Sequence, residues 1–125
     1  MAMALLDVGD HEAENDGVRV LGNLSINLEN FRVGVAGEVI YVTYHEMELL
    51  RVLSARPDKV ISYDEITQAL WGNSSHTSVR HLNVLVHRLR LKLSASKPYV
   101  IETVRGRGYG LLKARELENA DDWSS

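Results

Sequence analysis

The sequence predicts an α+β domain in which a small antiparallel sheet precedes three helices and a C-terminal β-hairpin. Three observations support this fold class. Residues 18–42 alternate in short apolar runs separated by turn residues, which is typical of antiparallel strands. Helix start signals follow at Thr43 and at Ser62. After Pro98 comes a segment rich in β-branched residues that is interrupted by an Arg-Gly turn, which indicates a hairpin.

The composition is that of one domain of ordinary size. Of the 125 residues, 45% are hydrophobic, so the chain can bury a core. There are no cysteines, which excludes disulfides, thiol nucleophiles and Cys-ligated zinc. No apolar run reaches the roughly 20 residues of a membrane helix, and residues 1–6 lack the basic start of a secretion signal. We therefore expect a cytoplasmic protein without a membrane partner.

The two ends of the chain differ from its centre. Residues 1–17 are polar and acidic without periodicity, and we expect a flexible arm or linker stub there. Residues 18–113 form the expected globular domain. Residues 114–125 are expected to form an acidic, flexible tail.

Charge is distributed unevenly along the chain. The formal net charge is -3, from 14 Lys and Arg against 17 Asp and Glu. Residues 80–115 nevertheless contain nine Lys and Arg and a single acid, Glu102. A block of this kind favours a polyanionic partner for one face of the domain. A basic face that is simply solvated is the alternative that charge alone leaves open.

The predicted strands are short. The N-terminal sheet is expected from the apolar runs 18–21, 24–26, 31–35 and 39–42. The hairpin is expected from residues 99–104 and 109–112, with residues 105–108 as its turn.

Two of the helices begin with a capping box. In Thr43-x-x-Glu46 the hydroxyl and the carboxylate can satisfy backbone N–H groups of the first turn, which predicts a helix over residues 44–55. Ser62-x-x-Glu65 repeats the pattern and predicts a short helix over residues 63–71. Gly72 is a natural end for that second helix.

The third helix is predicted over residues 76–95 and has two unlike faces. Its apolar stripe consists of Leu82, Val86, Leu89 and Leu93. Its opposite side carries Arg80, Val84, His87, Arg88 and Leu91. Because a short polar loop joins it to the second helix, the two helices have the form of a helix-turn-helix unit.

The polar side of the third helix has the residues needed to read DNA in the major groove. Arg88 lies mid-face, where a guanidinium can bond guanine O6 and N7, and Val84 can meet a thymine methyl group. Arg80, near the helix start, is better placed for a phosphate. A solvated amphipathic helix is the alternative, but such a face has no use for the apolar Val84 and Leu91.

The hairpin tip is a second candidate contact with DNA. The glycines on either side of Arg107 permit a tight turn, and Arg105 and Arg107 can extend into a narrow minor groove. An ordinary turn decorated with charge is the alternative. The position of the tip directly after a basic amphipathic helix favours the DNA interpretation.

Five segments together resemble the C-terminal effector domain of OmpR/PhoB-type bacterial response regulators. They are Val42-Thr43-x-x-Glu46-x-x-Leu49-Leu50, Val60-Ile61-Ser62, Leu70-Trp71-Gly72, Val86-His87-Arg88-Leu89-Arg90-Leu91-Lys92-Leu93 and Thr103-Val104-Arg105-Gly106-Arg107-Gly108-Tyr109. The resemblance covers about residues 20–113. It implies a winged helix-turn-helix fold with a four-stranded N-terminal sheet, three helices and a hairpin wing.

The resemblance also implies a function, sequence-specific binding of double-stranded DNA in transcription regulation within a two-component system. The base contacts it implies, together with the reading of the helix face, are Val84, His87 and Arg88. The expected backbone contacts are Trp71, Arg80, His81, Arg90 and Thr103, and the expected minor-groove contacts are Arg105 and Arg107. The loop expected to approach RNA polymerase contains Asn73, Ser74, Ser75 and His76. Direct DNA repeats and a head-to-tail dimer on DNA are further expectations.

The sequence departs from the family pattern at three positions. The family commonly has Asp at the position of Asn83 and His at that of Leu85, and many members are basic at Gly110. These differences affect the target sequence and the backbone contacts rather than the fold. Residues 1–17 are too short for a phosphoacceptor receiver domain. We therefore expect either an effector domain separated from its receiver or a protein that works without phosphorylation.

Two other classes of protein agree less well with the sequence. An enzyme is not expected: His45-Glu46-Met47-Glu48-Leu49 lacks the second His of a zinc-protease helix, and His76, His81 and His87 are not four residues apart. We expect no metal and no cofactor. A winged-helix module that binds proteins without binding DNA is the alternative function, and Val84 and Leu91 could serve it. The arginines of both candidate contact elements favour DNA.

Overall fold

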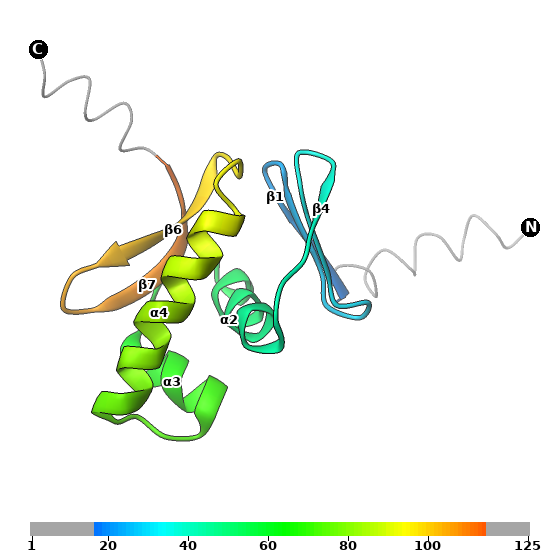
Figure 1. The fold of residues 1–125 in the computed structure, drawn as a ribbon. Coiled ribbons are helices and arrows are strands. Elements are labelled where there is room, and N and C mark those ends of the chain that lie inside the picture. The colour runs from blue at the N-terminus through cyan, green and yellow to red at the C-terminus, as the bar shows by residue number, and fades with distance from the viewer. Residues whose placement is uncertain (1–16, 115–125) are drawn as a thin grey trace, which may run out of the picture.

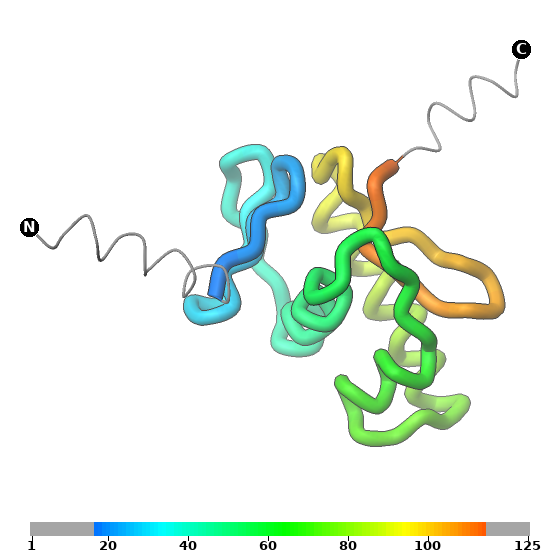
Figure 2. Tube along the Cα trace, turned by 180° about the vertical axis from the view of Figure 1, so that it is seen from behind, coloured from blue at the N-terminus to red at the C-terminus, as the bar shows by residue number. Residues whose placement is uncertain are grey.

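A computed structural model describes residues 17–114 of the chain (Figures 1 and 2). The elements in chain order are β1 (Val18–Leu21), β2 (Leu24–Asn27), β3 (Arg32–Val35), β4 (Glu38–Ile40), α2 (Tyr44–Ala55), β5 (Val60–Ser62), α3 (Tyr63–Trp71), α4 (His76–Lys92), β6 (Tyr99–Val104) and β7 (Gly108–Lys113). The predicted α+β class, with its N-terminal sheet, helices and C-terminal hairpin, is confirmed. Apart from Gly17 and Ala114, the expected arm and tail lie outside the described residues.

The first four strands form an antiparallel sheet in the order β1-β2-β3-β4. The register pairs Ile26 with Val33 and Leu24 with Val35, and all four side chains are at most 3% exposed. One face of the sheet therefore belongs to the core, as the alternation predicted. The sheet stands on one side of α2, while the C-terminal hairpin stands on the other (Figures 1 and 2).

The capping box predicted for α2 is confirmed. The Thr43 hydroxyl accepts from the backbone N–H of Glu46 at 3.2 Å, and Glu46 Oε1 accepts from the backbone N–H of Thr43 at 2.9 Å. The helix buries Met47, Leu49, Leu50 and Leu53. Burial of this stripe contributes more to helix stability than intrinsic propensity does.

The capping box predicted for α3 is only half formed. The Ser62 hydroxyl accepts from the N–H of Glu65 at 3.0 Å, but the Glu65 carboxylate pairs with Arg56 instead of returning to Ser62. Ser62 is also the last residue of β5, an unpredicted strand, and it pairs with Gly108 of β7. At the other end Gly72 ends α3 as predicted, in a left-handed conformation with φ 75°.

Helix α4 begins as predicted and ends three residues earlier than predicted. Ser75 accepts from the N–H of Ser78 at 3.1 Å and so caps the helix. The last helical residue is Lys92, so the predicted end at residue 95 is wrong. Residues 93–95 form a turn, closed by a bond from the N–H of Ser96 to the carbonyl of Leu93 at 2.9 Å. The chain must reverse here to reach β6, and serines that flank such a turn compete with the helix for hydrogen bonds.

The C-terminal sheet has the order β5-β7-β6, so β7 is its central strand. Strand β7 passes very close to β5 at Gly108. A Cβ atom there would lie 1.9 Å from the Ile61 carbonyl oxygen, so only glycine fits. At the hairpin tip Gly106 has φ 76° in the turn of residues 105–107.

The β1–β2 turn joins the N-terminal sheet to the loop between α4 and β6. Asn23 donates from its backbone N–H to the Lys97 carbonyl at 3.0 Å, and its side-chain oxygen accepts from the Lys97 N–H at 2.7 Å. Its amide nitrogen donates to the Ala95 carbonyl at 3.1 Å. These bonds fix the sheet relative to the end of α4.

Candidate nucleic-acid interface

One side of α4 is open to solvent over most of the helix. Val84 is 49% exposed and Leu91 is 65% exposed, and Arg80, His87 and Arg88 are exposed as well. In Figure 1 α4 crosses the front of the molecule, and none of the described elements passes over it. The structure therefore brings the predicted base-contact residues together on one uncovered surface.

This surface is electrostatically one-sided. Helix α4 contains Arg80, Arg88, Arg90 and Lys92 and no acidic residue. The helix N-terminus adds a partial positive charge of its own. A polyanion that approaches the open side of α4 therefore meets the exposed Arg80 and Arg88, and no carboxylate of this helix repels it.

Leu85 lies on the other side of α4. Its side chain is 9% exposed and belongs to the hydrophobic core. A leucine at this position contributes to packing, and it offers no polar group to a phosphate.

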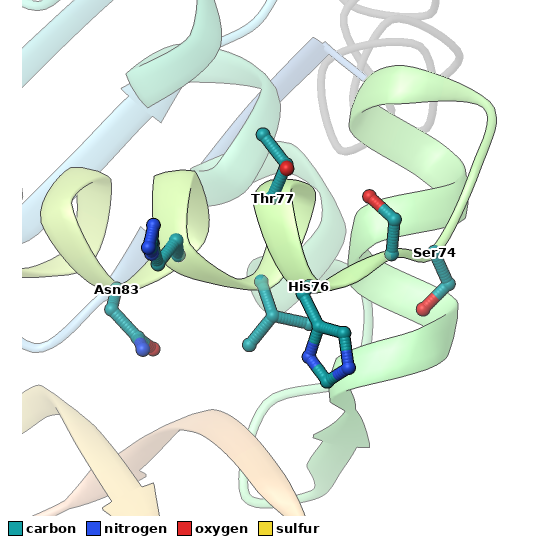
Figure 3. A pocket seen from close by; sticks show the side chains of 7 residues that line it. Ser74, His76, Thr77 and Asn83 are labelled. Atoms are coloured by element: carbon teal, nitrogen blue, oxygen red, sulfur yellow. The ribbon is translucent and has the colours of Figure 1, made fainter.

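The start of α4 borders an open hollow. Its lining residues are Ser74, Ser75, His76, Thr77, Val79, Arg80 and Asn83. In Figure 3 His76 and Asn83 project from the same side of α4, and Thr77 projects from the opposite side. The hollow therefore lies along the side of α4 that carries Asn83.

Two hydrogen-bonded links tie α4 to the hairpin. The Arg90 guanidinium donates to the Ile101 carbonyl at 2.8 Å and to the Thr103 hydroxyl at 2.5 Å. Seven residues earlier, Asn83 Oδ1 accepts from the Tyr109 hydroxyl at 2.5 Å. Thr103 and Tyr109 are register partners across β6 and β7, so both links reach the same point of the hairpin. They hold the wing at a fixed position relative to the helix face.

The Tyr109 hydroxyl is well suited to this link. The side chain is 5% exposed, and its ring meets Tyr63 edge-on with centroids 5.5 Å apart. Burial raises the pKa of Tyr109 above its ordinary value, Tyr63 raises it further, and Arg90 acts in the opposite direction. The phenol therefore keeps its proton at neutral pH and donates it to Asn83.

A third link joins α4 to α2, and sequence reasoning missed it. Lys92 Nζ lies 2.7 Å from Glu46 Oε1, the same oxygen that caps α2. The Glu46 side chain is 2% exposed. The capping box identified Glu46, but no sequence signal pointed to Lys92, which lies 46 residues away.

Trp71 lies between two histidines at the end of α3. Its ring centroid is 5.4 Å from that of His45 on α2 and 6.0 Å from that of His81 on α4. His81 is exposed, while Trp71 and His45 are partly buried. The predicted backbone contacts Trp71 and His81 thus lie side by side where α3 and α4 meet.

The two wing arginines have different surroundings. Arg105 and Arg107 are both exposed at the tip. Arg107 also lines a shallow hollow with residues 56–60, which connect α2 to β5. Its backbone carbonyl accepts from the N–H of Tyr63 at 3.3 Å. Arg105 is not among the residues that line this hollow, so its side chain is the less confined of the two predicted minor-groove arginines.

The predicted polymerase-contact loop is exposed, but two of its residues have structural bonds. Ser75 caps α4, and the Asn73 amide donates to the Trp71 carbonyl at 3.3 Å. Ser74 and His76 are exposed at the edge of the hollow (Figure 3).

Residues 17–114 lack both a cluster of metal ligands and a membrane-spanning helix. No group of three or more His, Cys, Asp or Glu side chains there could hold a metal ion. No helix in that part of the chain is long and apolar enough to cross a membrane.

A helix-turn-helix unit followed by a hairpin wing defines this chain as a winged helix-turn-helix domain. Residues 37–111 match the family model described as "Transcriptional regulatory protein, C terminal". The chain therefore belongs to this family, the OmpR/PhoB-type effector domains of response regulators. The family is one of transcription-regulator domains and not a known enzyme family.

Curated relatives agree with this assignment. The chain is 36% identical over 103 residues to the transcriptional regulatory protein CseB of Streptomyces coelicolor, covering 82% of this chain and 43% of CseB. It is 32% identical over 90 residues to the heme response regulator HssR of Staphylococcus aureus, covering 71% of this chain and 40% of HssR. The chain thus spans less than half the length of these relatives.

Solved structures agree as well. The RstA DNA-binding domain of Klebsiella pneumoniae, crystallised in complex with the RstA box, superposes with a TM-score of 0.68 at 29% identity, covering 76% of this chain and 96% of that one. DrrB of Thermotoga maritima, an OmpR/PhoB homologue, has the same fold with a TM-score of 0.68 at 24% identity, covering 87% of this chain and 51% of that one.

Proposed function

We propose that this domain binds double-stranded DNA in a sequence-specific manner and thereby regulates transcription. Helix α4 lies in the major groove, and the hairpin tip enters the adjacent minor groove. The observation that carries the proposal is the uncovered, acid-free side of α4 with Arg80, Val84, His87 and Arg88. The major groove is about 12 Å wide and admits one helix.

The residues of this side have separable roles. Arg88 and Val84 read base edges, with His87 beside them, because they lie at the centre of the exposed side. Arg80 and His81 lie near the helix start, where the phosphate backbone passes, and Trp71 supports His81 from α3. Arg90 is held against Thr103, so the two present one joint donor surface to a phosphate at the wing.

The wing extends the interface past the edge of the major groove. Arg105 enters the minor groove, where a narrow groove concentrates negative potential. Arg107 contributes charge from the other side of the tip. The crystallised complex of RstA with its box supports duplex DNA as the partner of this fold.

The remaining expectations concern assembly and signalling. We propose binding to direct repeats by two copies arranged head to tail, and an approach of residues 73–76 to RNA polymerase. The domain would then act on the bacterial chromosome in the cytoplasm. Names of relatives such as HssR support a response-regulator role for the longer proteins to which such domains belong.

The test is selection of bound duplexes from a random pool, followed by binding curves of three variants. Arg88→Ala should lose about 1–3 kcal/mol of discrimination among sequences. Arg80→Ala should weaken all duplexes equally and reduce the slope of log affinity against log salt by about 1. Arg32→Ala removes an exposed arginine from β3 and serves as the control, with wild-type binding expected. Full discrimination by Arg88→Ala, or salt-independent binding by the unmodified protein, would contradict the proposal.

A protein-binding module is the second candidate function. Val84 and Leu91 are exposed apolar residues on the same side of α4, and they favour an apolar partner. Retention on a heparin or mixed-sequence DNA column, with elution by salt, separates the two functions. A module that binds only proteins would not be retained.

A further inference from the structure

The open side of α4 combines positive charge with apolar surface. Val84 is 49% exposed and Leu91 is 65% exposed, and a spacing of seven residues places the two on nearly the same side of the helix. Arg80 and Arg88 are exposed beside them. A partner that carries charge alone would leave the apolar pair in contact with water, which is unfavourable. A segment that carries both carboxylates and apolar side chains therefore suits this surface.

Residues 115–125 have this composition. They contain the runs Glu116-Leu117-Glu118 and Asp121-Asp122-Trp123, so each of the two large apolar side chains stands within two positions of two carboxylates. The four carboxylates are set against one base, Arg115. Helix α4 has four Lys and Arg and no acid, so the two segments are complementary in charge. Residues 115–125 also follow the stretch 37–111 that matches the family model, so the family match assigns them no role.

The point from which residues 115–125 start lies close to the end of α4. The backbone N–H of Ala114 donates to the carbonyl of Pro98 at 2.5 Å, and Pro98 belongs to the loop that follows α4. Figures 1 and 2 both show the end of β7 beside this loop. With 17 residues, α4 is about 26 Å long. Residues 115–125 can span up to about 36 Å, so they are long enough to follow α4 back to its start.

The other acidic segment, residues 1–16, starts from a less suitable place. It precedes β1, an edge strand of the N-terminal sheet, and that sheet stands on the far side of α2 from the hairpin (Figures 1 and 2). The end of β1 nearer to α4 is its last residue, Leu21, because the following turn bonds to the loop after α4 through Asn23. Residues 1–16 join the opposite end of this strand.

We propose that residues 115–125 bind the open side of α4 and compete with DNA for it. Leu117 and Trp123 cover Leu91 and Val84, and the carboxylates pair with the arginines of the helix. The inference rests on the proposed function, because the surface covered is the one proposed to enter the major groove. A duplex must then displace the segment, so its apparent affinity is lowered by the fraction of molecules in which α4 is covered. The domain thereby limits its own binding to weak, non-specific sites.

The main test neutralises the four carboxylates and measures DNA affinity. The test variant combines Glu116→Gln, Glu118→Gln, Asp121→Asn and Asp122→Asn. The matched control makes the same kinds of substitution, with the same change in net charge, in the other acidic segment: Asp7→Asn, Asp10→Asn, Glu12→Gln and Glu14→Gln. We expect the test variant to bind specific and mixed-sequence duplexes about 3- to 10-fold more tightly than the control at low salt. The difference should disappear at high salt, because exposed ion pairs are screened.

Two further variants test the apolar part of the contact. Trp123→Ala removes the ring that covers Val84, so it should tighten DNA binding by about 2- to 4-fold. Trp123→Phe keeps an apolar ring and should bind as the unmodified protein does. The net charge is unchanged in both variants, so an effect of overall charge on affinity does not contribute.

A measurement without DNA tests the contact directly. The backbone amide NMR signals of Val84, Arg88 and Leu91 should differ between the unmodified protein and the test variant at low salt. The signals of the buried Leu82 and Leu89, on the other side of α4, should change less. The control variant should match the unmodified protein throughout the helix.

The outcomes distinguish this inference from the proposed function. If neither the unmodified protein nor any variant binds duplex DNA, the proposed function fails, and the amide signals still decide whether residues 115–125 bind α4. If the protein binds DNA and the test and control variants have equal affinity, the competition is refuted. If only the control variant binds more tightly, residues 1–16 are the occupant, and the inference is refuted. Unchanged signals at Val84, Arg88 and Leu91 in the test variant refute the contact itself.

Discussion

Replacing Glu46 by Ala should destabilise the domain more than the loss of one surface carboxylate would. Glu46 is 1% exposed, and a single oxygen serves two partners. It accepts from the backbone N–H of Thr43 at 2.9 Å and from Lys92 Nζ at 2.7 Å. The substitution therefore removes half of the α2 cap and the link between α2 and α4 together.

The magnitude follows from these contacts. The lost hydrogen bond to the Thr43 N–H costs about 0.5–1.5 kcal/mol. The Lys92 side chain is 36% exposed and regains water, so its lost partner costs about 1 kcal/mol rather than the full cost of a buried pair. The lost methylene adds about 0.8 kcal/mol. The sum is about 2–3 kcal/mol, which corresponds to a drop in Tm of roughly 10–20 °C for a domain of this size.

Urea and thermal denaturation of three variants measure this effect. Glu46→Gln keeps an acceptor for the Thr43 N–H and loses the charge, so it should cost about half as much as Glu46→Ala. Glu65→Ala is the control, because Glu65 is 53% exposed and its pair with Arg56 is open to solvent; we expect a change below about 1 kcal/mol. Equal destabilisation of the domain by Glu46→Ala and Glu65→Ala would contradict this prediction.

Three further predictions concern the core and the wing. Leu89→Ala should cost about 2–5 kcal/mol in denaturation, because Leu89 is 0% exposed, whereas Leu91→Ala on the open side should stay within about 0.5 kcal/mol. Gly108→Ala should lower the free energy of unfolding by at least about 3 kcal/mol, since its Cβ would meet a β5 carbonyl oxygen at 1.9 Å. Gly106→Ala, in open space at φ 76°, should lower it by only about 1 kcal/mol. Equal losses of stability in the two variants would contradict this prediction. The pKa of Tyr109 is raised in the folded protein, so the stability that the protonated phenol contributes is complete below pH 10 and declines above it. Tyr109→Phe should lessen this decline in the free energy of unfolding, as measured by unfolding curves over a pH series.

Several features of the fold could be predicted because their causes are local. The helix starts at Thr43 and Ser62 follow from hydroxyl groups that accept from backbone N–H groups three residues further on. The open and buried sides of α4 follow from residue spacing alone, and Val84 and Leu89 lie where the spacing placed them.

Other features could not be predicted because their causes lie far away in the chain. Strand β5 is three residues long, and its identity as a strand comes from pairing with β7 some 48 residues later, as in Ile61 with Tyr109. The end of α4 at Lys92 depends on the turn required before β6. The half-formed box of α3 arises because Arg56, nine residues from Glu65, competes for its carboxylate.

The candidate site shows the same division. Its exposed residues Arg80, Val84 and Arg88 were identified from the sequence, together with the arginines of the wing. The hydrogen bonds that hold α4 to the wing were not identified from the sequence. They join Arg90 to Thr103 and Asn83 to Tyr109, which are 13 and 26 residues apart in the chain.

By itself, the sequence determined the strands of residues 18–42, the starts of the three helices, the hairpin and the place where positive charge gathers. Caps and residue periodicity act within a few positions of the chain, so these features have local causes. Only the tertiary structure decided how α4 and the wing are held together. That geometry depends on hydrogen bonds between side chains brought together by packing, such as Tyr109 with Asn83 and Lys92 with Glu46. No local pattern encodes the distance between such partners, because it is the burial of the whole core that places them.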